Sequence, residues 1–415
     1  MSSNPLQQSE LWEIARQLVS FDTMSASSNV QAAEYLATFL EDSGFSFRLL
    51  KETMQGVEKA TVLAWVGPPV PGGLIISGHT DIVPFAGQPG WTSDPLVLHT
   101  DGQRIFGRGT SDMKVFLAQA ILAAKRCSQR TLKRPLVYIF TCDEELAGQG
   151  AERLIKILPQ LFSAFPLPAV ALIGEPTNFD VFPAHKGYAA FDIVVRGKGG
   201  HSSAPDRGLN AIERMAEVIR LLKETNEHLR KRISPENAML FPESPSSVFN
   251  CGTITGGLAA NMIAETCRLT ASIRVAPGDQ VEDLLQALRE RIDNDIAKSM
   301  KEFAPACGVF IEQVIVAPPM RSPTTDAFCN LLCQVMGRRA DRGAPYSTDG
   351  GQFQQIGIHS YICGPGLLEE AHQPNENIPV TNFVAGLEKL EQIIYEWCVN
   401  RDSGRTTLSG GGLIH

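Results

Sequence analysis

The chain has 415 residues, of which 43% are hydrophobic and 20% are charged, and its formal net charge is −8. This length exceeds one comfortable hydrophobic core, so two domains are expected. The negative charge argues against a nucleic-acid-binding surface, and no apolar run is long enough to span a membrane. The start, Met1–Pro5, has no basic segment followed by an apolar core, so no secretory signal is expected. The nine cysteines form no Cys-x-x-Cys pair and mostly lie in apolar runs, which favours buried thiols in a reducing, cytoplasmic compartment.

The first half of the chain alternates helical and strand patterns. Amphipathic helices are expected at Leu11–Phe21 and Asn29–Leu40, and a strand at Thr61–Val66. The next apolar run, Leu74–Ile76, predicts a buried strand that leads directly to His79 and Asp81. Ligand sites in α/β proteins lie where central strands leave the sheet, so this pair is a candidate site. Taken alone, it is also compatible with a solvated loop histidine beside a capping aspartate.

Acidic residues recur after the strands that follow. Asp112 comes after a Gly-rich turn, Glu144 and Glu145 after an apolar run from Leu136, and Glu175 after another run from Ala169. The steps from His79 to Asp112, to Glu145 and to Glu175 are each roughly thirty residues, the length of one βα repeat. The acids therefore fall on successive loops at one edge of a largely parallel sheet.

Each acid also has a purely structural interpretation. Asp112 could cap a helix over Met113–Lys125, and Glu144 and Glu145 could open a helix toward Leu158, where acids suit the helix dipole. A second histidine, His372, follows the short strand Ser360–Cys363. Two histidines and three carboxylates at one sheet edge together favour a two-metal site.

The pattern changes near Phe182. The order strand, helix, two strands, helix, strand predicts a small α+β, ferredoxin-like sandwich at 183–316, inserted into an α/β domain made of 1–182 and 317–415. The Gly-flanked loop at His201 does not complete a dinucleotide-binding fingerprint. A final helix is expected at Asn382–Trp397, and the Gly- and Ser-rich end, 403–415, is expected to be loose.

Five motifs carry a family resemblance. The motifs are Ser77–Asp81, Gly107–Lys114, Asp143–Glu145, Gly174–Thr177 and Ala371–Pro374. In order and spacing they resemble those of the co-catalytic zinc amidohydrolases and peptidases. Within that family they are most similar to the acetylornithine deacetylase branch. The resemblance implies a catalytic domain with a mixed, largely parallel sheet between helices. It also implies that the inserted domain is a lid that forms a homodimer.

The resemblance implies roles for the matching residues. Asp112 would bridge two metal ions, His79 and one further acid would hold one ion, and His372 with the other acid would hold the second; those acids are Glu145 and Glu175. Asp81 would orient His79, and Glu144 would be the general base.

Further roles fall in the inserted domain. His201 would reach the site of a neighbouring subunit, and Asn261 and Arg274 would hold a substrate carboxylate. Val115 and Ala264 depart from the family pattern, which usually has Gly and Pro at these positions. Neither is a ligand, but Val115 would alter the packing behind Asp112, and Ala264 would loosen the turn of the lid.

The ligand set suits up to two zinc ions per chain, with cobalt or manganese as substitutes. The expected reaction is hydrolysis of the amide bond of an N-acyl amino acid, foremost N-acetylornithine to ornithine and acetate in arginine biosynthesis. A succinyl-diaminopimelate desuccinylase, another aminoacylase or a dipeptidase remains an alternative. A metal-free binding protein on the same fold would lack a ligand, and a serine hydrolase would need the absent G-x-S-x-G motif.

Overall fold

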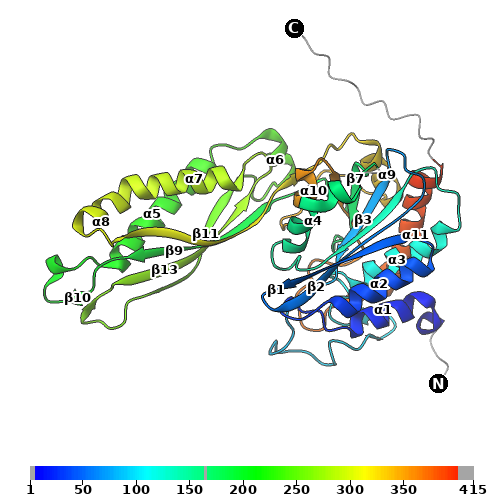
Figure 1. The fold of residues 1–415 in the computed structure, drawn as a ribbon, viewed down its shortest axis with the longest axis horizontal. Helices are drawn as coiled ribbons and strands as arrows, with labels where there is room; N and C mark the ends of the chain where they lie inside the picture. Colours follow the sequence, from blue (N-terminus) through cyan, green and yellow to red (C-terminus); the bar gives the residue numbers. More distant parts are fainter. Residues whose placement is uncertain (1–4, 163–165, 401–415) are drawn as a thin grey trace, which may run out of the picture. The chain divides into compact units, whose positions relative to one another are not determined.

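A computed structural model describes residues 5–162 and 166–400, so the expected loose end at 403–415 lies outside the described residues. The chain forms two compact units. The first comprises residues 1–183, 322–340 and 348–415, and the second comprises 184–321 and 341–347 (Figure 1). The second unit thus includes two short stretches, 317–321 and 341–347, that were predicted to belong to the first domain. Among the described residues, no helix is both long and apolar enough to cross a membrane.

The first unit is built on a six-stranded mixed sheet. The strand order is β1 (Ser46–Met54), β2 (Val57–Val66), β6 (Leu136–Thr141), β3 (Leu74–His79), β7 (Val170–Ile173) and β16 (His359–Ile362). The pairs β6–β3, β3–β7 and β7–β16 are parallel, whereas β1–β2 and β2–β6 are antiparallel. This confirms the predicted α/β class with a largely parallel sheet.

Helices cover both faces of this sheet (Figure 1). The helices α1 (Glu10–Ser20), α2 (Val30–Asp42) and α11 (Val380–Ile394) pack around α3 (Lys114–Ser128), and α9 (Ala327–Met336) packs on α11. Twelve of the fifteen residues of α3 are buried, because other elements surround it on nearly every side. On the other face, α4 (Gln149–Leu161) packs with α10 (Gly350–Gln355). The alternation along β6 follows this layering, since Leu136, Tyr138 and Phe140 point into the α3 core.

A three-stranded sheet lies beside the large one in the first unit. It pairs β17 (Asn377–Pro379) with β5 (Arg104–Phe106), and β5 with β4 (His99–Thr100), all antiparallel. The pairing of β17 with β5 brings the segment after His372 against the segment before Asp112.

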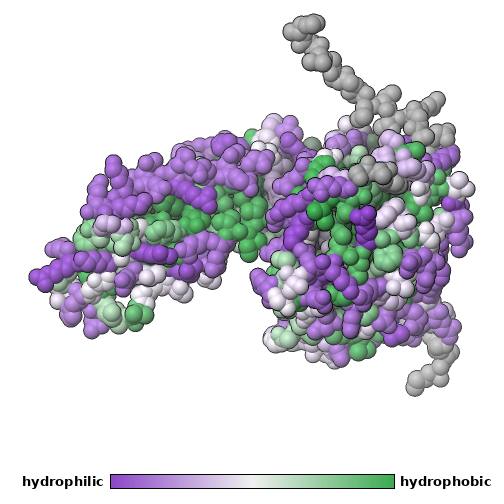
Figure 2. All heavy atoms as spheres, viewed as in Figure 1, coloured by the Kyte–Doolittle hydropathy of each residue, from purple (hydrophilic) through white to green (hydrophobic). Residues whose placement is uncertain are grey.

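The second unit has the element order expected for a ferredoxin-like sandwich. Its antiparallel sheet runs β11 (Val248–Gly256), β13 (Thr266–Val275), β9 (Gly187–Arg196) and β14 (Gly308–Ala317). The helices α5 (Ala211–Leu229) and α7 (Val281–Ile292) bury their apolar residues in a core shared with this sheet. Figure 2 shows hydrophilic residues along the side of this unit where α7 lies, with hydrophobic residues visible beside them.

Shorter elements complete the second unit. They are β8 (Ala184–His185), which pairs with β15 (Met320–Arg321), β10 (Gly200–His201), which pairs with β12 (Met262–Ile263), and the helices α6 (Pro235–Leu240) and α8 (Lys298–Phe303). The β10–β12 pair joins the loop of His201 to the loop of Asn261.

Candidate metal centre

Three adjacent parallel strands deliver the predicted residues to one edge of the large sheet. His79 is the last residue of β3, Glu175 follows the end of β7, and Glu144 and Glu145 follow the end of β6. Because β6, β3 and β7 are neighbours and parallel, their carboxyl ends meet at the same edge. Asp112 reaches that edge from the loop before α3.

The His79 side chain is buried and fixed by hydrogen bonds on both ring nitrogens. Its Nδ1 lies 2.9 Å from the carbonyl oxygen of Asp81, which can only accept, so Nδ1 carries a proton. Its Nε2 then faces carboxylates, at 2.9 Å from Asp112 Oδ1 and 3.9 Å from Glu175 Oε1. This is the arrangement of a metal-ligating imidazole whose other nitrogen is held by a carbonyl group.

His372 lies on the opposite side of Asp112. Its Nε2 is 3.3 Å from Asp112 Oδ2 and 3.1 Å from Glu145 Oε1. The two oxygens of Asp112 therefore face different histidines, Oδ1 toward His79 and Oδ2 toward His372. This geometry sorts the remaining acids, with Glu175 on the His79 side and Glu145 on the His372 side.

Glu144 lies close to the His79 side of the cluster. Possible ligand atoms of His79, Glu144 and Glu175 lie within 4.8 Å of one another, as do those of His79, Asp112 and Glu145. The expected helix at Glu144 and Glu145 is wrong, because both residues lie in a turn and α4 begins only at Gln149. The alternative interpretation of Asp112 as an N-cap does not hold, since Met113 occupies that position and no side chain caps α3.

The acids in this cluster repel one another in a buried place. Burial raises the pKa of Glu144 and of Glu175 well above the usual value, and the charges of neighbouring carboxylates raise both further. Burial also raises the pKa of Glu145, although its hydrogen bond to His372 opposes this shift. The cluster therefore carries more negative charge than its protein surroundings balance.

The two imidazoles respond to that charge. Hydrogen bonds to Asp112 and Glu145 raise the pKa of His372 to about 10. Burial alone would lower the pKa of His79, but the hydrogen bond to Asp112 and the charge of Glu175 outweigh burial and raise it. Burial also opposes ionisation of Asp112, yet its bonds to His372 and His79 lower the pKa of this carboxyl.

These observations fit divalent cations. The imidazoles of His79 and His372 face different oxygens of Asp112, and the excess negative charge is what metal ions would balance. His79, Asp112 and Glu175 could hold one ion, and Asp112, Glu145 and His372 could hold a second.

Asp81 contacts the His79 ring through its backbone. The carbonyl group of Asp81, rather than its carboxylate, holds the His79 ring, and the carboxylate Oδ1 lies 3.6 Å from Nδ1. The carboxylate accepts the backbone N–H groups of Glu144 and Glu145, each at 3.1 Å, and the Ser25 hydroxyl at 3.1 Å. Asp81 thus fixes the turn that presents both glutamates.

A buried ion pair supports the same turn and was missed by the sequence analysis. Asp143 adopts a φ of 55°, and its carboxylate lies 2.9 Å from Lys59 Nζ and 3.2 Å from Arg153 Nη2. Lys59 also donates to the carbonyl groups of Ser25 and Ser27. The sequence signal for this contact was a lysine in β2, directly before the apolar run of that strand.

The predicted residues of the second unit separate into two places. His201 pairs with Met262, and the Ser202 N–H donates to the Asn261 carbonyl at 3.1 Å, so His201 and Asn261 lie in neighbouring segments. Arg274 lies near the other end of β13, and the continuous strand from Thr266 to Arg274 spans about 27 Å at the usual rise. One copy of this unit does not bring all three residues together.

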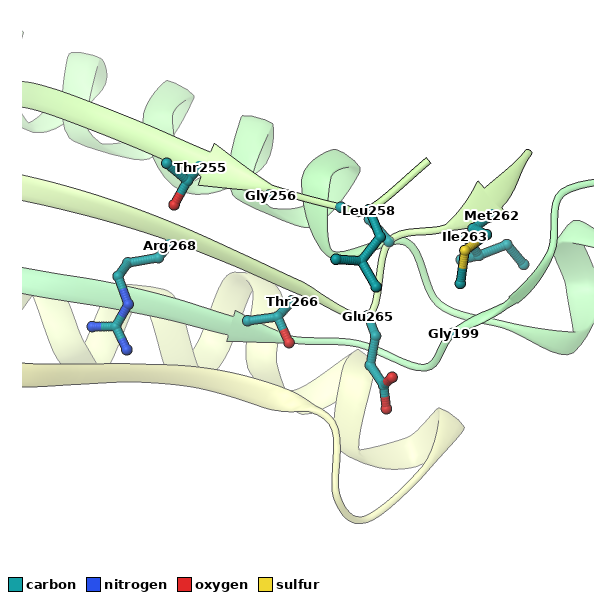
Figure 3. Close-up of a pocket in the computed structure, with 11 residues that line it drawn as sticks. Gly199, Thr255, Gly256, Leu258, Met262, Ile263, Glu265, Thr266 and Arg268 are labelled. Carbon is teal, nitrogen blue, oxygen red and sulfur yellow. The ribbon is translucent and has the colours of Figure 1, made fainter. Parts of the chain in front are cut away.

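A cavity of about 380 Å³ lies at the Asn261 end of the second unit. Its lining comes from the end of β11, the start of β13 and the segment between them (Figure 3). It includes Leu258, which is 91% exposed, and Met262, but none of the predicted metal ligands. All the residues that line this cavity therefore belong to the second unit.

The comparison with known proteins identifies the family. The profile of the peptidase family M20/M25/M40 matches residues 75–396, which include every predicted metal ligand. The chain belongs to this family. An acetylornithine deacetylase from Photorhabdus laumondii is 33% identical over 398 residues, covering 94% of this chain and 98% of that relative. Another from Proteus mirabilis is also 33% identical, covering 93% of this chain and 96% of its own.

Solved structures agree with the fold of this M20 protein. A tripeptidase from Staphylococcus aureus aligns with a TM-score of 0.71 at 18% identity, covering 92% of this chain and 96% of its own. The M20/M25/M40 membership makes the protein a hydrolytic enzyme that cleaves amide bonds and depends on metal.

Proposed function

We propose that this M20 enzyme removes the acyl group from an N-acyl amino acid, with N-acetylornithine as the main substrate and ornithine and acetate as products. The observation that carries this proposal is the ligand cluster, in which one oxygen of Asp112 faces His79 and the other faces His372. The specific substrate is supported by the 33% identity to acetylornithine deacetylases over almost the whole chain. Such a reaction would supply ornithine for arginine biosynthesis.

The ligand assignment follows the two sides of Asp112. His79, Asp112 and Glu175 would hold one zinc ion, and Asp112, Glu145 and His372 the other, with cobalt as a substitute. Bound zinc lowers the pKa of water and polarises the amide carbonyl group. The remaining chemistry, proton transfer and substrate positioning, falls to side chains of the protein.

Glu144 is the proposed general base. Because the turn held by Asp81 directs Glu145 toward His372, its neighbour Glu144 is left for proton transfer. Burial and the charge of Glu175 raise the pKa of Glu144, which brings its proton affinity closer to that needed at neutral pH. Glu144 would take a proton from the attacking water and pass it to the leaving amine.

His201 is the proposed oxyanion donor. Its Nδ1 accepts the backbone N–H of Ser203 at 3.2 Å, so the proton of the neutral ring is on Nε2. The side chain is exposed, so an Nε2–H group is available to donate to the oxygen that becomes negative during attack.

Arg274 is the proposed anchor for the substrate α-carboxylate. Its guanidinium lies over the Tyr188 ring at 4.5 Å, and no acidic side chain among the described residues pairs with it. Burial lowers the pKa of Lys186, and the positive charge of Arg274 lowers it further, to about 8. A positive charge that lowers the proton affinity of a neighbouring lysine favours a bound anion at this end of the sheet.

A homodimer explains the separation of these residues. The distance of about 27 Å along β13 is far longer than an acyl amino acid, so His201 and Asn261 of one chain cannot share a substrate with Arg274 of the same unit. If one site combines them, they come from two subunits. Strand β11 offers a suitable surface, because it is a sheet edge whose residues from Asn250 to Gly256 are all exposed.

The contrast between two neighbouring glutamates tests the base assignment. Glu144→Gln should fold and retain metal but lose turnover by on the order of a hundredfold or more, because the amide cannot accept the proton. Glu145→Gln should instead weaken metal binding. Elemental analysis and kcat measured on both variants check this, and normal turnover of Glu144→Gln would place the base elsewhere.

The substrate prediction can be checked with a panel of acetyl, succinyl and peptide substrates. N-acetylornithine should give the highest kcat/KM, and Arg274→Ala should reduce that value on the order of a hundredfold, with higher KM and lower kcat, because the anchor also places the amide. The matched control is Arg268→Ala on the same strand, whose guanidinium pairs with Asp192. Equal rates on N-acetylornithine and its α-amide analogue would refute the carboxylate anchor.

The shared site can be tested by mixing Glu144→Gln subunits with His201→Ala subunits. A hybrid dimer has one site with an intact Glu144 and with His201 from the partner. Random mixing makes half of the dimers hybrid, so roughly a quarter of full activity should return. If hybrids form but activity stays at the level of the parents, His201 acts within its own chain.

A further inference from the structure

Glu376 is a buried carboxylate outside the predicted ligand set. Its side chain is 1% exposed, and it follows His372 by four residues. Glu376 is not a candidate metal ligand, since neither of its oxygens belongs to the groups of possible ligand atoms. A buried carboxylate is costly unless each of its oxygens finds donors, so its partners define what it does.

Four donors fill the Glu376 carboxylate. Its Oε1 accepts the backbone N–H groups of Ser111 at 2.8 Å and Asp112 at 3.0 Å. Its Oε2 accepts the Arg108 guanidinium at 2.8 Å and the Gly109 N–H at 3.1 Å. A carboxylate has about four acceptor positions, so all of them are used on one loop, and that loop ends at Asp112.

The backbone conformation of the loop from Arg108 to Asp112 makes its N–H groups converge. Gly109 has a φ of 84°, in the left-handed region that favours glycine, and a Cβ there would lie 2.9 Å from the Lys114 side chain. This conformation turns successive N–H groups inward toward one anion. The carboxylate of Glu376 therefore holds the backbone of Asp112 itself.

A second route connects the same loop to His372. Arg108 donates to Gln88 Oε1 at 2.5 Å, and Gln88 Nε2 donates to the His372 carbonyl at 2.8 Å. His372 has a φ of 62°, which is uncommon for a residue other than glycine and needs support from its surroundings. The contacts from Asp112 through Glu376, Arg108 and Gln88 back to His372 form a closed ring.

We propose that Glu376 is a positioning residue that fixes the spacing between the bridging carboxylate of Asp112 and the imidazole of His372. Glu376 belongs to the same chain segment as His372, and its carboxylate binds the Asp112 loop. One residue therefore couples Asp112 and His372, which are 260 positions apart in the sequence. The proposal rests on the metal centre proposed above. Residues that orient metal ligands commonly change metal affinity ten- to a hundredfold when they are altered.

Glu376→Gln is the direct test. The amide group keeps one acceptor oxygen but directs an NH₂ group at backbone N–H groups, so the Asp112 loop loses its anion. Zinc affinity, measured by competition with a chelator, should fall about ten- to a hundredfold. Added zinc should restore kcat, and KM for the substrate at saturating zinc should stay at the wild-type value.

The matched control is Glu370→Gln. Glu370 lies two residues before His372, and its carboxylate pairs with Arg104 at 2.7 Å and accepts from Asn377 at 2.7 Å. Glu370 has no contact with the Asp112 loop, so the zinc affinity of the Glu370→Gln enzyme should stay at the wild-type value. An equal loss in both variants would mean that any damage to this segment weakens the site, which would overturn the specific role of Glu376.

Loss of folding in Glu376→Gln is addressed by Glu376→Asp. The shorter acid retains the charge opposite Arg108 but cannot reach all four donors, so it should remain folded by circular dichroism and still lose zinc affinity. A folded variant that binds zinc as tightly as wild type overturns the proposal. A wild-type enzyme that binds no zinc would instead refute the metal centre, so the two failures are distinguishable.

Discussion

The crowding of acidic side chains at one sheet edge is the constraint on which the site depends. Asp112, Glu144, Glu145 and Glu175 converge on two imidazoles in a largely buried place, and burial opposes ionisation of each acid. Such a cluster lowers the stability of the folded protein unless cations balance its negative charge. The surrounding loops can be understood as supports that hold these acids in place against their mutual repulsion, and Asp81, Asp143 and Glu376 do so through backbone N–H groups and buried cations.

Much of this site could be predicted from the sequence because the fold repeats. One βα unit follows another at about thirty residues, so a polar residue after each apolar run arrives at the same sheet edge. His79 and Glu175 illustrate this, since each lies at or just beyond the end of a buried parallel strand. The α/β class followed from the same alternation.

Other features depend on contacts that the sequence does not display. Glu144 and Glu145 suit a first helical turn, but the Asp81 carboxylate captures their N–H groups and α4 starts only at Gln149, after Gly148 at a φ of 69°. The role of Glu376 likewise arises from a loop more than 260 residues away. The separation of Arg274 from Asn261 was not expected, because the family resemblance assigned both residues to one substrate carboxylate, whereas β13 runs as a continuous strand from Thr266 to Arg274.

The bridging role of Asp112 is the central claim, and zinc titration of the metal-free protein by calorimetry tests it most directly. The wild-type protein should bind two ions per chain. Asp112→Ala, confirmed as folded by circular dichroism, should lose tight binding of both ions, because one carboxylate serves the two positions. If this variant still binds two zinc ions with wild-type affinity, or if the wild-type protein binds none, the account of the site is contradicted.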